Sequence, residues 1–349
     1  ISAYRDGEYD TEHDDDLTPL DIQVTFFGED TDQFSQELRL VSPKTDRYDW
    51  VAGFYYFDGE QEAANSACFG VDLYNVLIPD LAPFADALSG CGSVPTKVTS
   101  EMYAGYIHGN YRFNEQWELT AGLRYTNEDK DVRWEQINEP NDPATAAALE
   151  AATGLPLTQA PGALFGAINY DTIKDDRSED DWSPTIGINY FASESVMIYA
   201  KYARGFKSGG FNAEFMTSGL DFFEYEDETV DSYEIGIKST LLDDKLRLNA
   251  TAFRSEFDDY QVFQFLTNAQ GATTLQLTNA AEVTSQGFEL ETVLVPTDRL
   301  KFTLNTTYLD ASYDEFANPH PALPDFDDND LPYAPELKVF AGAQSLSLI

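Results

Sequence analysis

The chain has 349 residues, of which 62 are acidic and 21 basic, so its formal net charge at pH 7 is −41. This balance excludes nucleic acid as a partner, because binding to phosphates requires clustered Lys and Arg. No run of about 18 apolar residues occurs, which excludes a membrane-spanning helix but leaves membrane-spanning strands open.

The first residues, Ile1 to Tyr4, have the pattern of the middle of a strand and not of a signal peptide. Cys68 and Cys91 follow inside one predicted polar link. A single pair close in the sequence, without a third cysteine or a nearby histidine, favours a disulfide over a metal site. A disulfide implies the periplasm or the cell surface, so we expect a native chain longer than this sequence, with a leader before it.

Period-two alternation predicts strands along the chain. In the stretch 117–125, Trp117, Leu119 and Leu123 share one face, while Glu118 and Arg124 take the other. The same split recurs at 233–238 and 300–305. The aromatic content of 14% supports strands, since rings suit a pleated surface. A tilted strand of about 11 residues would span about 25 Å, the height of the apolar band of an outer-membrane barrel.

The connections between these strands alternate in length. Short turns are predicted near 44–47, 114–116, 192–195, 242–244 and 296–299. Long polar links are predicted at 10–31, 59–99, 130–180, 207–229, 258–280 and 312–333, with a short helix at 144–152 because that stretch is rich in Ala. Six structureless links of this length are unusual in a compact soluble domain. They are typical of outer-membrane barrels, which have short periplasmic turns and long extracellular loops.

Two features have competing interpretations. Tyr and Trp near the predicted strand ends suit a membrane–water interface, although each ring taken alone also suits a soluble core. Acidic runs at 10–16, 175–181, 221–228 and 325–330 suit solvated loops, with binding of divalent cations as the alternative.

Nearly the whole chain resembles one family, the TonB-dependent receptors. The segments 36–42 (QELRLVS) and 50–56 (WVAGFYY) resemble a central strand pair of these proteins, and 199–212 (YAKYARGFKSGGFN) is the most specific match. Further matches are 183–184, 233–238 (YEIGIK), 249–253, 279–282 (NAAE) and 287–291 (GFELE).

The resemblance implies an all-β fold: part of a transmembrane antiparallel meander β-barrel, about 12 of 22 strands, occupying residues 1–349. The N-terminal plug, the segment that contacts TonB and the closing C-terminal strands are expected outside this sequence. The implied location is the outer membrane of a Gram-negative bacterium, with lipid and lipopolysaccharide around the barrel. The implied function is active transport of a scarce large solute, such as a ferric siderophore, cobalamin or an oligosaccharide, with TonB engaged through the plug.

Enzyme chemistry has little support. His13, His108 and His320 lack catalytic or zinc-ligand spacing, and no phosphate loop or nucleophile elbow is present. We therefore expect no catalytic residue, no metal site and no cofactor.

If the segment binds a solute, the best candidates form a basic and aromatic group at the end of a strand: Arg204, Phe206, Lys207, Phe211 and Asn212. Such a group suits an anionic chelate or a sugar. The alternative is a structural corner in which Gly209 and Gly210 provide unusual backbone angles.

For the whole protein, the alternative to active transport is a passive porin-like barrel without energy coupling. A soluble β-rich binding protein is a more distant alternative.

Overall fold

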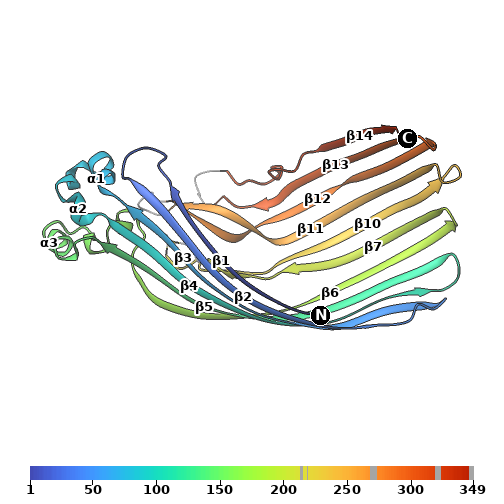
Figure 1. Cartoon of the computed structure of the whole chain (residues 1–349), viewed down its shortest axis with the longest axis horizontal. Coiled ribbons are helices and arrows are strands. Elements are labelled where there is room, and N and C mark those ends of the chain that lie inside the picture. The colour runs from blue at the N-terminus through green and yellow to red at the C-terminus, as the bar shows by residue number, and fades with distance from the viewer. Residues whose placement is uncertain (213–214, 218, 268–272, 319–323, 346–349) are drawn as a thin grey trace.

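The computed structural model in Figure 1 describes the chain apart from residues 213–214, 218, 268–272, 319–323 and 346–349. Twelve strands form one antiparallel sheet, and each strand lies beside its neighbours in the chain. They are β1 (Ser2–Asp14), β2 (Gln23–Val41), β3 (Tyr48–Phe69), β4 (Gly90–Arg112), β5 (Trp117–Pro140), β6 (Tyr170–Ser193), β7 (Val196–Lys207), β10 (Glu228–Leu241), β11 (Leu246–Thr267), β12 (Thr273–Thr297), β13 (Leu300–Phe316) and β14 (Leu337–Ser345). The sheet curves but does not close, which confirms the predicted partial meander barrel.

The two ends of the molecule differ, as the sequence predicts. Tight turns join the strands at one end, called here the turn end, and longer connections gather at the other, the loop end (Figure 1). The loop end carries the helices α1 (Val71–Leu77), η1 (Pro79–Phe84), α2 (Ala85–Leu88), α3 (Pro143–Thr153), η2 (Leu157–Gln159) and η3 (Gly162–Phe165), and a small hairpin of β8 (Gly210–Phe211) and β9 (Glu224–Tyr225). Helix α3 confirms the helix expected at 144–152. No helix of the described ranges is long and apolar enough to cross a membrane.

Most strands are longer than the predicted length of about 11 residues, which is wrong for them, whereas β7 has 12 residues and β14 has 9. β5 has 24 residues and β12 has 25, and much of the predicted long links at 10–31, 59–99, 130–180 and 258–280 is strand. The reason is visible in β5, where the alternation changes sense along the strand. Beyond Tyr125 the large buried apolar residues are Val132 and Trp134, and the charged residues that alternate with them, Asp131 and Arg133, are exposed. Polar composition conceals a strand of this kind.

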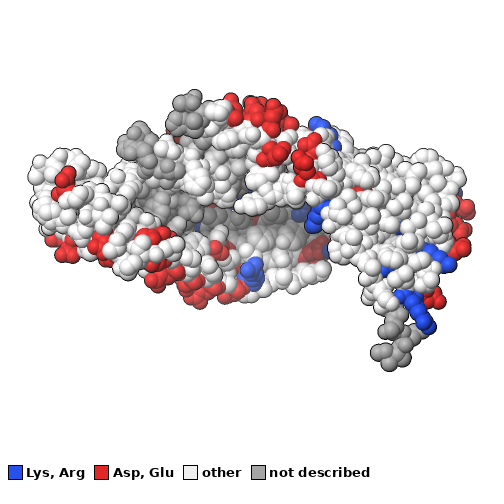
Figure 2. All heavy atoms as spheres, turned by 90° about the horizontal axis from the view of Figure 1, so that it is seen from above, with Lys and Arg blue, Asp and Glu red and all other residues white. Residues whose placement is uncertain are grey.

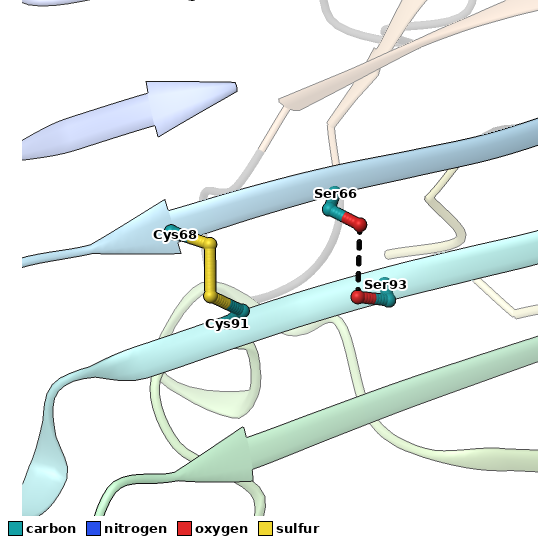
Figure 3. Close-up of a disulfide and its surroundings, with 4 residues drawn as sticks. All are labelled: Ser66, Cys68, Cys91 and Ser93. Atoms are coloured by element: carbon teal, nitrogen blue, oxygen red, sulfur yellow. Dashed lines mark hydrogen bonds between the residues drawn. A yellow bond between two sulfur atoms is a disulfide. The ribbon is translucent and has the colours of Figure 1, made fainter. Parts of the chain in front are cut away.

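A disulfide joins Cys68 and Cys91, as predicted (Figure 3). The two residues lie opposite each other at the ends of β3 and β4 and not in the loop itself. Two residues further from the loop, the Ser66 and Ser93 hydroxyls lie 2.9 Å apart on the same pair of strands. The disulfide therefore closes the base of the connection that contains α1, η1 and α2.

The two helical connections at the loop end pack on each other and form a small core of their own, called here the helical cap. Leu73, Tyr74 and Leu88 of the first connection pack with Ala146 and Leu157 of the second. The Tyr74 hydroxyl donates a hydrogen bond to the Leu88 carbonyl oxygen over 2.5 Å, and burial raises the pKa of this phenol. The Asp142 carboxylate caps α3 by accepting from the Ala144 and Thr145 amides.

Replacing both cysteines by serine, C68S/C91S, is predicted to loosen the helical cap. Closing a loop of this size removes conformational entropy from the unfolded loop, worth about 3 kcal/mol. Hydrogen exchange of residues 70–89 in the full-length protein measures the change. The matched control is S66A/S93A, which alters the neighbouring pair and keeps the disulfide. Equal exchange rates in the two double variants would show that the disulfide does not hold the helical cap in place.

Candidate functional site

One face of the sheet, the apolar face, carries a band bounded by aromatic pairs. On β5 and β6, the ring centroids of Trp117 and Tyr190 lie 4.6 Å apart near the turn end. The ring centroids of Tyr125 and Trp182 lie 4.7 Å apart towards the loop end. The side chains between them on this face are apolar: Leu119, Ala121, Leu123, Pro184, Ile186 and Ile188. The band is about 26 Å long at about 3.3 Å per residue along the strand.

The loop-side aromatic row continues across the sheet. Its further members face each other on adjacent strands: Tyr56 with Tyr103, Tyr202 with Tyr233, and Phe288 with Tyr308. The line of register partners through Tyr56 reaches β6 at Asp180, whereas the line through Tyr308 reaches β6 at Ile188. Between the pairs on β3/β4 and β12/β13, the aromatic row thus shifts by about eight residues along the strands while it crosses about seven spacings of about 4.8 Å between neighbouring strands. This shift corresponds to a strand tilt of roughly 40°. Barrel strands in membranes tilt by similar angles.

The opposite face of the same strands, the polar face, is held by charged and hydroxyl groups. Glu37 accepts a hydrogen bond from Tyr106 over 2.5 Å and lies 2.7 Å from Arg39. Arg112 forms ion pairs with Asp49 at 2.6 Å and Glu118 at 2.8 Å. Such groups require water or polar partners beside them, so the two faces suit different solvents.

Beyond the loop-side aromatic row the two faces exchange character. Asp129, Asp131 and Arg133 of β5 then occupy the side that was apolar, and Val132 and Trp134 occupy the other side. These inner residues belong to a cluster of Val94, Val132, Trp134, Met216 and Phe223. Figure 2 shows Asp and Glu side chains gathered over the part of the molecule nearer the helices, then a broad uncharged region towards the turn end.

The sheet has a notch at the loop end, because β7 and β10 stop earlier than the strands beside them. In the described part, pairing of β6 with β7 begins only at Thr185, and β10 pairs with β11 only up to Asp258. The segment 208–227 joins β7 to β10, and its described residues lie in this notch and contact both sides of it. We call it the bridging segment.

Arg177 of β6 anchors the bridging segment on one side. Its side chain is only 8% exposed, and it donates to the Tyr225 carbonyl over 2.7 Å, to Glu226 over 3.0 Å and to Glu179. Burial disfavours the charged guanidinium, but Glu179 and Glu226 outweigh it and raise the pKa of Arg177. Lys130 of β5 adds bonds of 2.7 Å to the Ser208 hydroxyl and to the carbonyl of Gly209.

Asn212 anchors the bridging segment on the other side. This side chain is buried, and its amide donates to the carbonyl oxygens of Phe222 at 2.7 Å and Leu277 of β12 at 2.8 Å. Its own oxygen accepts from the Leu277 amide at 2.9 Å. Phe211 packs 5.6 Å from Phe223 in the same inner cluster. Together, the bonds of Arg177 and Asn212 attach the bridging segment to β6 on one side and to β12 on the other.

The five residues predicted from the sequence do not all lie together. Arg204 and Phe206 have the parity of the apolar face, and Arg204 lies 3.5 Å from Asp231. Lys207 is the last residue of β7 and its side chain is exposed. Phe211 and Asn212 are held in the bridging segment. Their role in solute binding stays a prediction.

Sequence reasoning missed Arg177, although a signal was present. It is the one arginine within the acidic run 175–181, where neighbouring carboxylates would repel one another without a cation between them. A buried charge needs partners, and those partners, Tyr225 and Glu226, come from a segment about fifty residues away.

One group of three carboxylates in the described part has oxygens within 4.8 Å of one another: Glu179, Glu226 and Asp227. Arg177 already bonds to the first two, so a cation occupies this cluster without any metal. Binding of divalent cations by the acidic runs stays a prediction, and the run 175–181 lies in β6 and not in a loop. His320 lies outside the described residues.

Comparison with known proteins identifies the class. The family model described as TonB dependent receptor-like, beta-barrel matches residues 2–346, so the chain belongs to this family. Members of the family are transport receptors of Gram-negative outer membranes.

Solved structures with the same fold are TonB-dependent receptors. The ferric yersiniabactin uptake receptor FyuA from Yersinia pestis superposes with a TM-score of 0.72 at 16% identity, over 99% of this chain and 43% of that one. The siderophore receptor PiuA from Acinetobacter baumannii superposes with a TM-score of 0.63 at 17% identity, over 99% of this chain and 52% of that one. The ferric citrate transporter FecA superposes with a TM-score of 0.60 at 14% identity, over 98% of this chain and 42% of that one. The chain thus spans about half the length of these receptors or less.

The variant R177M is predicted to release the bridging segment. Arg177 and Glu179 form a buried ion pair, and removing the guanidinium leaves the Glu179 carboxylate without its charged partner at a cost of about 3 kcal/mol. Limited proteolysis of the full-length protein should then cut residues 208–227 faster than in the unaltered protein. K174Q, an exposed position on the other face of the same strand, is the matched control. If both variants are cut at the unaltered rate, Arg177 does not hold the segment.

Proposed function

We propose that this chain forms part of the barrel wall of an outer-membrane receptor that imports a scarce large solute with energy supplied through TonB. The observation that carries the proposal is the apolar band between two aromatic rows, on strands that belong to the TonB-dependent receptor family. Rows of aromatic side chains on both sides of an apolar band mark the two membrane–water interfaces of outer-membrane barrels.

The apolar face in this proposal contacts lipid, including lipopolysaccharide at the loop side, and the polar face lines the lumen. Ionised Glu37, Arg39 and Arg112 would be costly against hydrocarbon but are readily solvated in a wet interior or paired with a luminal domain. The plug that engages TonB would occupy this lumen. It is supplied by the rest of the receptor, in keeping with the share of the related structures that this chain covers.

The loop end in this proposal faces the outside, where the solute is captured. The bridging segment and the inner clusters give this mouth a packed wall, and the candidates Arg204, Phe206, Lys207, Phe211 and Asn212 lie at or near it. FyuA is described as a ferric yersiniabactin uptake receptor, PiuA as a siderophore receptor and FecA as a ferric citrate transporter. We infer that a ferric siderophore is the first solute to test, followed by cobalamin and oligosaccharides.

The direct experiment is uptake of labelled ferric siderophores, cobalamin and oligosaccharides by cells that carry or lack the full-length receptor, each in the presence and absence of TonB. We expect saturable uptake of one solute, falling to the level of receptor-free cells when TonB is deleted. A porin gives the opposite result: entry that rises linearly with concentration and is unchanged without TonB. That outcome would replace the proposal by passive diffusion.

A further inference from the structure

Carboxylates from both partners gather where the bridging segment contacts β6. They are Asp175 and Glu179 of β6, and Glu224, Glu226 and Asp227 of the bridging segment. On β6, Asp175 pairs with Val132, so its side chain has the parity of the inner side. The contact that holds the bridging segment therefore brings like charges together from its two sides.

Two cations offset part of this repulsion, and both are engaged with other groups. Arg177 donates to the Tyr225 carbonyl, Glu226 and Glu179, and it reaches Glu224 only at 3.7 Å. Lys130 of β5 donates to the Ser208 hydroxyl and the Gly209 carbonyl, and it lies 3.3 Å from Glu128. Glu224 thus has the weakest ionic support among the carboxylates that Arg177 contacts.

Glu224 instead meets another carboxyl group across the interface. Its side chain hydrogen-bonds to that of Asp175. Two carboxyl groups can bond in this way only when one of them carries a proton. Burial is the largest cause that raises the pKa of Glu224, Asp175 adds to it, and Arg177 opposes it only in part. The Glu224 side chain remains 44% exposed, so solvent protons reach it.

Gly209 brings the bridging segment directly onto these charged groups. Its amide donates to a Glu179 carboxylate oxygen over 3.0 Å. A Cβ at this position would lie 2.6 Å from the Arg177 guanidinium and 2.7 Å from the Glu179 carboxylate, so a larger residue would not fit without movement. Because the backbone lies against the charged groups, a change in their protonation acts on the attachment of the segment.

We propose that the contact between the bridging segment and β6 is a proton-responsive latch, in which Asp175 and Glu224 share a proton and hold the segment more tightly as the surroundings become acidic. The latch itself depends only on the described contacts. That it acts on the mouth of a transporter rests on the proposed function.

The direction of the pH dependence follows from the two states of the segment. When the segment is released, Glu224 is surrounded by water and its carboxyl has the ordinary pKa. When the segment is bound, the pKa of Glu224 is raised, so the bound state takes up a proton more readily. This contribution to attachment is complete below the ordinary carboxyl pKa and is lost as the pH rises through the raised value.

Limited proteolysis of residues 208–227 tests the latch in the full-length receptor, folded in detergent with a chelator, at about pH 5 and about pH 8. Comparing variants at the same pH cancels the pH dependence of the protease. E224Q has no titratable group at this position, and its amide can donate to Asp175. It should be cut about threefold more slowly than the unaltered protein at the higher pH and at a similar rate at the lower pH. D175N, the same change from the β6 side, should give the same pattern.

D176N and D221N are the matched controls. Asp176 follows Asp175 on the outer side of β6, and Asp221 is an exposed residue of the bridging segment. Both variants should be cut like the unaltered protein at each pH. The latch is overturned if E224Q and D175N differ from the unaltered protein by the same factor at both pH values, if they do not differ from it at all, or if the controls share their effect.

Heat-modifiable migration on gels reports folding of each variant separately. No solute takes part in the proteolysis, and uptake with and without TonB is measured independently. The latch can therefore fail while the transport proposal stands, and the transport proposal can fail while the latch stands.

Discussion

The structure depends on one constraint. Each strand satisfies its backbone hydrogen bonds with its neighbours in the sheet, so consecutive side chains point to opposite faces of that sheet. In the band between Trp117 and Tyr125 this places Leu119 and Leu123 on one side and Glu118 and Arg124 on the other. A sheet with such faces cannot be buried on both sides in a dry interior, since Glu37, Arg39 and Arg112 would lose their solvation. Hydrocarbon on one side and water on the other satisfies both.

The same constraint explains the part of the molecule beyond the loop-side aromatic row. In the proposed membrane placement water lies outside there, and the strands bury Val132 and Trp134 on the inner side instead. The strands continue because neighbours are still available to pair with, and where β7 and β10 stop, the bridging segment takes their place. Arg177 and Asn212 hold it from opposite sides. The mouth of the barrel is thereby a packed structure and not a set of free loops.

Much of the fold follows from the sequence. Alternation at 117–125 and the contrast of short and long connections predict the antiparallel sheet, and the cysteine spacing predicts the disulfide. Strand ends are not predictable in the same way, because Asp129 and Asp131 are polar whether they lie in a loop or on a wet strand. The partners of Arg177 and Asn212 are also hidden, since Tyr225 and Leu277 approach them only through the long-range pairing of the sheet.

Depth measurement of the tryptophans tests the central claim most directly. Full-length variants that keep Trp117, Trp134 or Trp182 as the single tryptophan of this segment, the others changed to Phe, are placed in bilayers with bromine at defined depths along the acyl chains. We expect quenching of Trp117 and Trp182 near opposite boundaries of the bilayer, and none of Trp134, which is fully buried on the inner side. If Trp117 and Trp182 are shielded from the bromine as completely as Trp134, the apolar face does not contact lipid and the account fails.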